Sequence, residues 1–395
     1  MQPLEKLRVL DLTQAMAGPY CTQILGDLGA DVIKVEPPGK GEMTRRGMGF
    51  RMKGDDTAAF LAINRNKRSL TLDLKSDEGR EILLALVRES DVLVENFRPG
   101  VTERLGLDYE TLKDVNPRLL YASISGFGQT GPHSSRAGFD LIAQGMGGVM
   151  SVTGEPGGDP VKSGLPISDL SAGMYLALGI LSAYIAREET GRGQHIDTSL
   201  FESVLSLAVW ETSELWSTGR VPEPFGSAHR LNAPYQALRT RDAYITVGAN
   251  NDKLWRAFCE AIGRPELIED ERFVDNNTRM ENRQELEAEL ERTTKEKDTA
   301  EWMEIFGEAG VPGGPIYNYK EVFEDPHTHE RQMMREYDHP VEGKVKTLGI
   351  PVKMSETPGD IRLPAPMLGE HAADVLRELG YDDDRIKALR DQEVI

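Results

Sequence analysis

The stretch that decides the fold is LRVLDLTQAMAGPYCTQILGDLGADVIKVE, from Leu7 to Glu36. It begins and ends with short apolar runs, LRVLDL (7–12) and DVIKVE (31–36), which are typical of buried strands. Between them, a small Gly- and Pro-containing turn at Thr13–Tyr20 leads into a helical stretch at 19–29. Strand, helix and strand at this spacing predict two parallel strands joined by a helical crossover.

The same alternation continues along the chain, with strand-like runs at 91–95 and 119–125 and helical stretches at 76–89 and 108–115. It predicts a large, doubly wound (Rossmann-like) α/β domain. The first turn lacks the GxGxxG pattern of dinucleotide sites. It nevertheless follows a strand, and open parallel sheets bind ligands at the carboxyl ends of their strands.

A second domain is indicated by a change of composition at 218–234, TGRVPEPFGSAHRLNAP, which is rich in Pro and Gly. We predict a large α/β domain at 1–217, a linker and small α+β domain at 218–325, and a linker and C-terminal part returning to the large domain at 326–395. The expected elements after residue 198 are a helix at 199–216, a hairpin turning at Thr240–Asp242, helices at 252–262, 283–295, 299–309, 321–334 and 370–379, and a strand at 346–352.

The composition narrows the class of protein. The chain has 395 residues, of which 39% are hydrophobic and 28% charged, as in ordinary soluble globular proteins. A net charge of −19 argues against a nucleic-acid partner. Cys21 and Cys259 are far apart and form no CxxC pair, so neither a metal site nor a disulfide framework is expected. The most apolar run, 170–186, predicts a buried core helix rather than a membrane span, and we expect a cytoplasmic protein.

One acidic residue, Asp169, lies at the start of that apolar helix, in GLPISDLSAGMYLALGIL (Gly164–Leu181). Backbone N–H groups at a helix N-terminus favour an ionised carboxylate. Residue type alone favours a capping role for Asp169 or Ser168. A catalytic role becomes the better interpretation only in the company of the chain's other motifs.

Those motifs resemble the class III CoA-transferases, the CaiB/BaiF family typified by formyl-CoA transferase. The resemblance implies that Asp169 is a nucleophile that forms an aspartyl anhydride and then an aspartyl-CoA thioester, without metal or cofactor beyond coenzyme A as substrate. The matching segments run from end to end: DLTQAMAGP from Asp11, DLGADVIKVE from Asp27, NKRS from Asn66, VENFRPG from Val94, YASISGFGQTGP from Tyr121, GFDLIAQ from Gly138, the Asp169 segment, TGRGQ from Thr190, GVPGGP from Gly310 and LGEH from Leu368.

The resemblance also implies a set of coenzyme-A-binding residues. Lys75, Arg98 and Arg104 suit the coenzyme's phosphates. Phe97 suits the adenine face, and Asn96 is expected to form a hydrogen bond with the ligand. Without the resemblance, each basic residue would be interpreted as a solvated surface charge. The full set is Gln14, Met16, Ala17, Leu72, Asp73, Leu74, Lys75, Asn96, Phe97, Arg98, Arg104, Ala137, Gly138, Phe139 and Asp140.

Two alternatives to a transferase stay open. Racemases and epimerases of the family, which act on 2-methylacyl-CoA, carry a His in a motif like AGHD. Here the motif is AGFD, with Phe139 thirty residues before Asp169. Phenylalanine neither accepts nor donates a proton, which favours the transferase. The second alternative is a CoA-binding protein without catalytic activity.

The substrate is indicated by departures from formyl-CoA transferases. Gln14, Met16 and Pro37 stand where those enzymes have His, Gln and Arg, and GSAH (Gly226–His229) replaces a run of glycines. Formate and oxalate are therefore not the expected acids. GSAH followed by APYQA resembles the branch that acts on succinyl-CoA and other dicarboxylates, including glutarate. The resemblance further implies an interlocked homodimer. Candidates to bind the distal carboxylate are Arg45, Arg46, His229 and Arg230.

Overall fold

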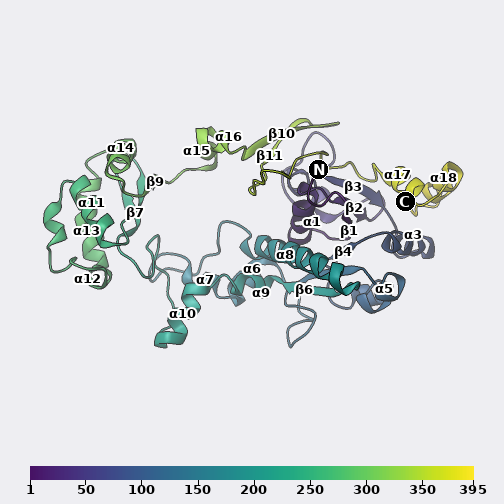
Figure 1. Ribbon diagram of the computed structural model, residues 1–395, viewed down its shortest axis with the longest axis horizontal. Helices are drawn as coiled ribbons and strands as arrows, with labels where there is room; N and C mark the ends of the chain where they lie inside the picture. The colour runs from purple at the N-terminus through teal and green to yellow at the C-terminus, as the bar shows by residue number, and fades with distance from the viewer. The chain divides into compact units, whose positions relative to one another are not determined.

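The computed structural model describes residues 1–395 and divides into two compact units (Figure 1). The large unit comprises Met1–Val149, Lys162–Ser213 and His327–Ile395, and the small unit comprises Met150–Val161 and Glu214–Pro326. The break after Ser213 falls close to the Pro- and Gly-rich segment. Residues 150–161, which the sequence assigns to the large domain, cluster with the small unit instead.

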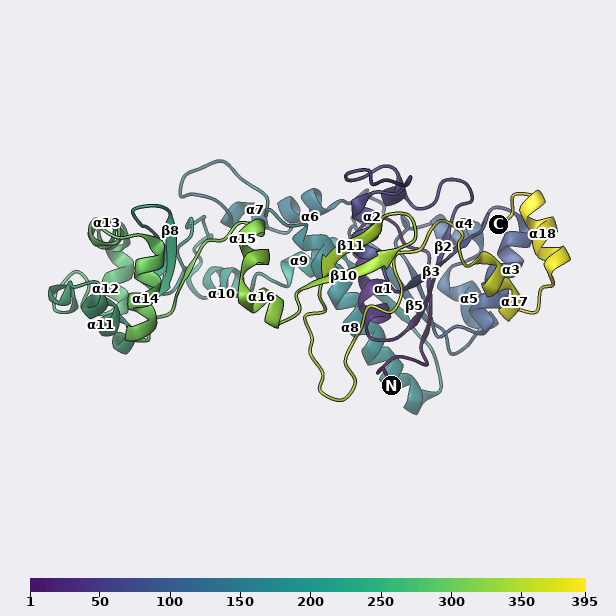
Figure 2. The same ribbon diagram turned by 90° about the horizontal axis from the view of Figure 1, so that it is seen from above.

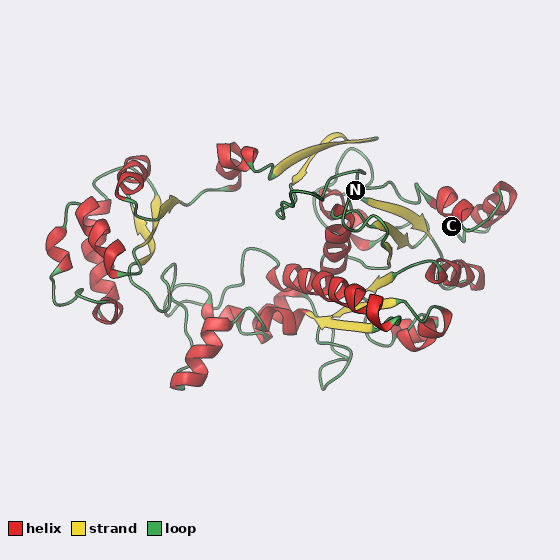
Figure 3. Cartoon of the chain, in the orientation of Figure 1, coloured by secondary structure: helices red, strands yellow, loops and turns green.

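The large unit is built on six parallel strands in the order β3-β2-β1-β4-β5-β6. Strands are yellow in Figure 3. This confirms the predicted parallel α/β sheet. The sequence analysis overlooked β3, because its first residues, Lys67, Arg68 and Ser69, are polar. The strands are β1 (Arg8–Asp11), β2 (Asp31–Glu36), β3 (Lys67–Thr71), β4 (Val92–Glu95), β5 (Leu120–Ser125) and β6 (His195–Ser199).

Helices cover both faces of this sheet (Figure 2). Alternation along β1 separates the two cores: Val9 faces one side and Leu10 the other. The Val9 side packs against α1 (Ala17–Asp27) and α8 (Ile167–Thr190), with α6 (Asp140–Met146) and α9 (Leu200–Leu205) beside α8. The Leu10 side packs against α3 (Asp77–Arg88), α4 (Val101–Leu105), α5 (Tyr109–Val115), α17 (Ala372–Glu378) and α18 (Asp383–Asp391).

Several predicted elements differ in the structure. The helix expected at 199–216 is interrupted after α9 and resumes as α10 (Val209–Thr218). The helix expected at 321–334 is interrupted at Asp325 and ends at Glu330, and Met334 begins a strand that pairs antiparallel with β11. The remaining elements of the large unit are η1 (Met43–Arg45), α2 (Ala58–Ile63), α16 (Pro326–Glu330), β10 (Met334–His339) and β11 (Gly343–Leu348), where Pro326 is the last residue of the small unit. The short helices α7 (Val149–Val152) and α15 (Tyr319–Glu324) belong to the small unit, except for Val149.

The small unit is an antiparallel three-stranded sheet, ordered β7-β8-β9, with helices packed against it. Its core contains the aromatic residues Trp255, Phe258, Trp302 and Phe306. The predicted hairpin and three helices are confirmed. The elements are β7 (Tyr235–Arg239), β8 (Tyr244–Gly248), α11 (Asp252–Ala261), η2 (Pro265–Ile268), α12 (Asn276–Glu281), α13 (Arg283–Thr294), α14 (Thr299–Ala309) and β9 (Gly313–Pro315).

Candidate active site

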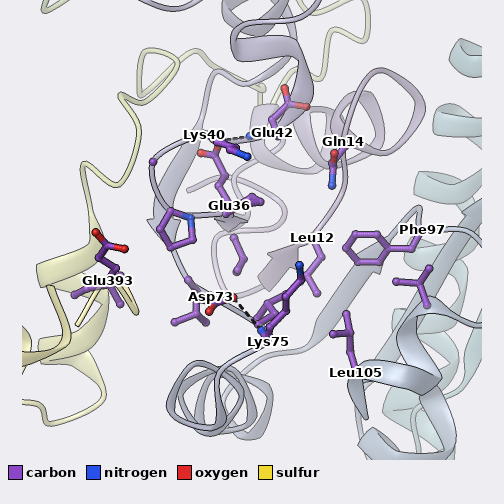
Figure 4. Close-up of a pocket in the computed structure, with 18 of the residues that line it drawn as sticks. Leu12, Gln14, Glu36, Lys40, Glu42, Asp73, Lys75, Phe97, Leu105 and Glu393 are labelled. Carbon is purple, nitrogen blue, oxygen red and sulfur yellow. Dashed lines mark hydrogen bonds between the residues drawn. The ribbon is translucent and has the colours of Figure 1, made fainter. Parts of the chain in front are cut away.

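A cavity of about 880 Å³ lies at the carboxyl ends of four parallel strands of the large unit (Figure 4). Gln14 follows β1, Glu36 ends β2, Leu72 follows β3 and Phe97 follows β4. The strand order reverses direction between β1 and β4, which are neighbours. The cavity therefore occupies the switch point at which open α/β sheets bind their ligands.

Part of the coenzyme set lines this cavity. Phe97 and Leu105 lie together on one side of it, and Glu393 lies on the opposite side. The apolar wall formed by Phe97 and Leu105 suits a planar base, and basic side chains border it. Lys40 and Arg390 also line the cavity, although the sequence motifs gave no signal for either. The predicted residues among the lining are Gln14, Leu72, Asp73, Leu74, Lys75, Phe97 and Arg104.

Other members of the set lie outside the lining. The Asn96 side chain is engaged with Gln14: its Nδ2 donates to the Gln14 carbonyl at 2.7 Å, and its Oδ1 accepts from the Gln14 N–H at 2.9 Å. Asn96 therefore shapes the turn after β1, and its expected hydrogen bond to the ligand stays a prediction. Met16 and Ala17 lie at the start of α1, Arg98 is exposed after β4, and Ala137–Asp140 precede and begin α6.

A buried charge network holds the turn after β1. Ala15 has a φ of 66°, and its N–H donates to Glu42 Oε2 at 3.0 Å. Lys34 Nζ donates to the Thr13 carbonyl at 2.9 Å, and Lys67 Nζ donates to Asp11 Oδ2 at 2.9 Å. Burial raises the pKa of the Asp11 carboxyl, but the two lysines outweigh burial and hold that pKa below its ordinary value. These contacts fix the left-handed backbone of Ala15 beside the cavity.

Asp169 is the third residue of α8, which begins at Ile167 after Pro166. Pro166 occupies the N-cap position, so neither Ser168 nor Asp169 is the cap, and that interpretation is wrong. Burial and the nearby charge of Asp140 raise the pKa of Asp169 to about 7. Desolvation and the charge of Asp140 therefore oppose the ionised form that the helix N-terminus favours.

Asp140 binds the start of the same helix. Its Oδ1 accepts from the Ser168 N–H at 2.9 Å, and its Oδ2 accepts from Gln144 Nε2 at 2.7 Å. The Ser168 hydroxyl also donates to the Asp140 carbonyl at 3.3 Å. Asp140 thus satisfies a backbone donor that a capping side chain would otherwise satisfy, and it places a second carboxylate close to Asp169.

Two close backbone approaches fix the surroundings of Asp169. A Cβ added at Gly173, one turn further along α8, would lie 2.7 Å from the Ala17 carbonyl oxygen. The first turns of α8 therefore lie against the start of α1, beside the turn after β1. A Cβ at Gly138 would lie 2.4 Å from Gly126 Cα, so the backbone before Asp140 crosses the chain after β5 in contact.

The four candidates for binding the acceptor have different environments. Arg45 is buried: its Nε donates to Glu36 at 2.7 Å and its Nη1 to Asp56 at 2.8 Å. Its guanidinium is bound by these carboxylates, and its proposed contact with an acceptor stays a prediction. Arg46 is exposed. In the small unit, Arg230 pairs with Glu214 at 2.8 Å, and His229 Nδ1 accepts from the Leu231 N–H at 3.1 Å.

Comparison with known proteins agrees with this arrangement. The sequence model of CoA-transferase family III matches residues 4–372. The human succinyl-CoA:glutarate CoA-transferase is 39% identical over 98% of this chain and 89% of its own. The acetyl-CoA:oxalate CoA-transferase of Acetobacter aceti is 42% identical over 95% of each chain. The crystal structure of a CaiB/BaiF family protein from Brucella suis is 41% identical, with a TM-score of 0.85 over 96% of this chain and 99% of that one.

Proposed function

The chain belongs to CoA-transferase family III, and from that premise we propose that it moves coenzyme A from succinyl-CoA, or a related dicarboxyl-CoA, to a carboxylic acid. The family membership makes the chain an acyl-CoA-dependent CoA-transferase. The choice of a dicarboxyl donor is supported by the likeness to the human enzyme named for succinyl-CoA and glutarate.

In the proposed mechanism, an oxygen of the Asp169 carboxylate attacks the thioester carbon of the donor. The C–S bond breaks, coenzyme A leaves as a thiolate, and a mixed anhydride remains on Asp169. The thiolate then attacks the aspartyl carbonyl, which releases the donor carboxylate and forms an aspartyl-CoA thioester. The acceptor carboxylate repeats these steps in reverse order. No net proton or electron is exchanged, so the reaction needs no cofactor besides coenzyme A.

The observation that carries this proposal is the state of Asp169. It is partly buried, it does not cap its helix, and its raised pKa shows a carboxylate poorly stabilised as an anion by its surroundings. A poorly solvated carboxylate is a better nucleophile than one tied into hydrogen bonds.

Trapping with hydroxylamine tests the nucleophile. Enzyme incubated with succinyl-CoA and hydroxylamine should carry a hydroxamate on Asp169, found by peptide mass spectrometry, and Asp169→Ala should lose both label and transfer activity. Asp77→Asn is the matched control, because Asp77 also lies in the first turn of a helix but is exposed. Turnover with an unlabelled Asp169 would overturn the mechanism.

The acceptor acid is identified less closely than the CoA donor by the residues and relatives described above. Arg46 and His229 stay candidates for a distal carboxylate, whereas Arg230 is engaged by Glu214. A 42% identical relative is named for oxalate, so oxalate belongs in the test beside glutarate, although the sequence departures argued against it. A panel of mono- and dicarboxylic acids against acetyl- and succinyl-CoA, followed by mass spectrometry of the CoA esters, identifies the pair with the highest kcat/KM.

The two alternatives to a transferase, a racemase and a CoA-binding protein without catalytic activity, predict different experimental results from the transferase. A racemase would exchange the α-proton of a 2-methylacyl-CoA with deuterated water, and Phe139 offers no group for that exchange. A CoA-binding protein without catalysis would be unaffected by Asp169→Ala. Deuterium incorporation at the α-carbon, or unchanged activity of Asp169→Ala, would therefore contradict the transferase mechanism.

We propose in addition that the enzyme is a cytoplasmic homodimer of interlocked chains. By length and hydropathy α8 is the one helix that qualifies as a membrane-spanning candidate. One side of α8 packs against α1 and β5, while Met174, Leu178 and Ile185 on it are 50%, 60% and 70% exposed. Exposed apolar side chains in a row on one helix are typical of a surface that packs against another protein.

A second copy of the chain would supply that cover. The mass in solution should then be twice the 43.8 kDa of one chain. Interlocked chains should also fail to exchange between tagged and untagged dimers unless they are unfolded. An active monomer would contradict the dimer, and rapid exchange would contradict the interlocking.

A further inference from the structure

The segment Arg390–Ile395 forms part of the wall of the coenzyme cavity. Arg390, Glu393 and Ile395 all line it, together with residues that follow β1 to β4. The family model matches residues 4–372, so this segment lies beyond that match. Its place in the site follows from the structure alone.

The segment Arg390–Ile395 is bound to the loop Leu72–Lys75, which lines the cavity. The Val394 carbonyl accepts from the Asp73 N–H at 2.8 Å, and Asp73 lies between Leu72 and Lys75 in that loop. Val394 and Leu389 are buried in the same apolar core as Leu72. Arg390 therefore lines the cavity from the end of α18, whose neighbouring residues Leu389 and Val394 are packed in the core.

Charged side chains of both signs line the cavity. Its four cationic side chains are Lys40, Lys75, Arg104 and Arg390. Its four carboxylates are Glu36, which is paired with Arg45, Asp73, which accepts the Lys75 N–H at 3.0 Å, Glu42, which accepts the Ala15 N–H at 3.0 Å, and Glu393. Neighbouring arginines near α18 are paired, Arg377 with Asp383 and Arg385 with Glu78.

Arg390 differs from these neighbours because it has no carboxylate partner and faces a cavity in a strongly acidic chain. A guanidinium in this position is suited to bidentate contact with a phosphate group. Coenzyme A carries phosphate at two places, the diphosphate and the ribose 3′-phosphate.

We propose that Arg390 is a coenzyme-phosphate-binding residue and that the segment Arg390–Ile395 is a structural part of the coenzyme site. This proposal rests on the proposed function, since it assumes that the ligand is a CoA thioester. Glu393 lines the same wall as an unpaired carboxylate and opposes the anion, so the two side chains of the segment should act in opposite directions.

The test is the affinity of the full-length enzyme for CoA, 3′-dephospho-CoA and pantetheine, measured by calorimetry. Arg390→Ala should weaken CoA binding about tenfold, as expected for one lost charge-assisted contact. Arg390→Lys should restore part of the affinity, and Glu393→Gln should tighten binding. Lys387→Ala is the matched control: Lys387 is an exposed cation on the same helix that does not line the cavity.

The three ligands separate the phosphates. A loss confined to CoA assigns Arg390 to the 3′-phosphate, and a loss shared by CoA and 3′-dephospho-CoA assigns it to the diphosphate. Unchanged affinity for all three ligands, or an equal loss for pantetheine, would overturn the proposal. Hydroxamate labelling of Asp169 at saturating CoA thioester should survive in Arg390→Ala, so failure here is distinguishable from failure of the nucleophile assignment.

Discussion

The carboxylate of Asp140 anchors the turn that carries Asp169: Asp140 Oδ1 accepts the Ser168 N–H at 2.9 Å, one residue before the proposed nucleophile. The same contact brings a second negative charge towards Asp169, whose pKa is raised to about 7 by burial first and Asp140 second. Positioning and pKa are therefore set by one side chain. An enzyme that needs a reactive carboxylate gains from both effects.

The first prediction concerns the pH dependence of transfer. Only the ionised form of Asp169 is a nucleophile, so kcat/KM should rise with pH through an apparent pKa near 7. Asp140→Asn keeps an oxygen for the Ser168 N–H but removes the charge, and it should shift the rise to lower pH. The measurement is a pH–rate profile of both enzymes from pH 5 to about 9.

The control for this prediction is Asp77→Asn, which removes an exposed charge from the start of another helix. Its profile should coincide with that of the wild type. A profile that stays unmoved in Asp140→Asn would show that the charge of Asp140 does not reach Asp169.

A second prediction follows from the same raised pKa, now as a stability effect. Between pH 4 and about 7 the unfolded chain releases the proton of Asp169 while the folded chain keeps it, so the free energy of unfolding falls as pH rises. Asp169→Asn does not titrate and should be more stable than the wild type at pH 8. We expect about 1–2 kcal/mol, because partial exposure to water screens part of the shift.

Denaturant unfolding at pH 4 and pH 8 measures this difference. The two proteins should differ little at pH 4, where the carboxyl is protonated in the folded chain and still partly protonated in the unfolded chain, whose pKa is 3.8. If Asp169→Asn and the wild type had equal free energies of unfolding at both pH values, burial would not destabilise the ionised Asp169 carboxylate.

Much of the fold was predictable because apolar strands alternate with helices, and the pattern at Leu7–Glu36 already contains the crossover. The strand at Lys67–Thr71 escaped because its buried lysine is compensated by Asp11, a contact that is remote in sequence. Strand order was likewise beyond a sequence argument, since it depends on which strands pair across crossovers of similar length.

The candidate site shows the same limit. Gln14, Leu72 and Phe97, which line the cavity, were predicted from the family resemblance of their segments. The ion pair of Arg45 with Asp56 gave no sequence signal, because it is visible only in the fold. Arg390 gave no signal, because its place in the cavity depends on how α18 packs against residues some three hundred positions earlier.

The third prediction concerns the contact between α8 and α1. Gly173→Ala would place a methyl group against the Ala17 carbonyl, where a Cβ would lie 2.7 Å away, and backbone must move to admit it. We expect a loss of about 1–3 kcal/mol in the free energy of unfolding and a lower kcat, because Asp169 lies one turn away. Gly307→Ala in α14 is the control, since a Cβ there meets open space and should be neutral or stabilising. A Gly173→Ala enzyme with wild-type stability and kcat would show that the two helices separate at no cost.

The last prediction separates two adjacent arginines. Arg45→Ala removes one partner of a buried ion pair with Glu36 and should cost about 3–5 kcal/mol of stability. Arg46→Ala removes an exposed side chain, so the midpoint of denaturant unfolding should not move.

If Arg46 binds the distal carboxylate, its loss should raise KM for dicarboxylic acceptors and leave KM for monocarboxylic acceptors unchanged. Arg51→Ala, another exposed arginine of the same segment, controls for the change in net charge. Equal effects of Arg46→Ala on both classes of acceptor would remove Arg46 from the acceptor site and leave His229 as the candidate.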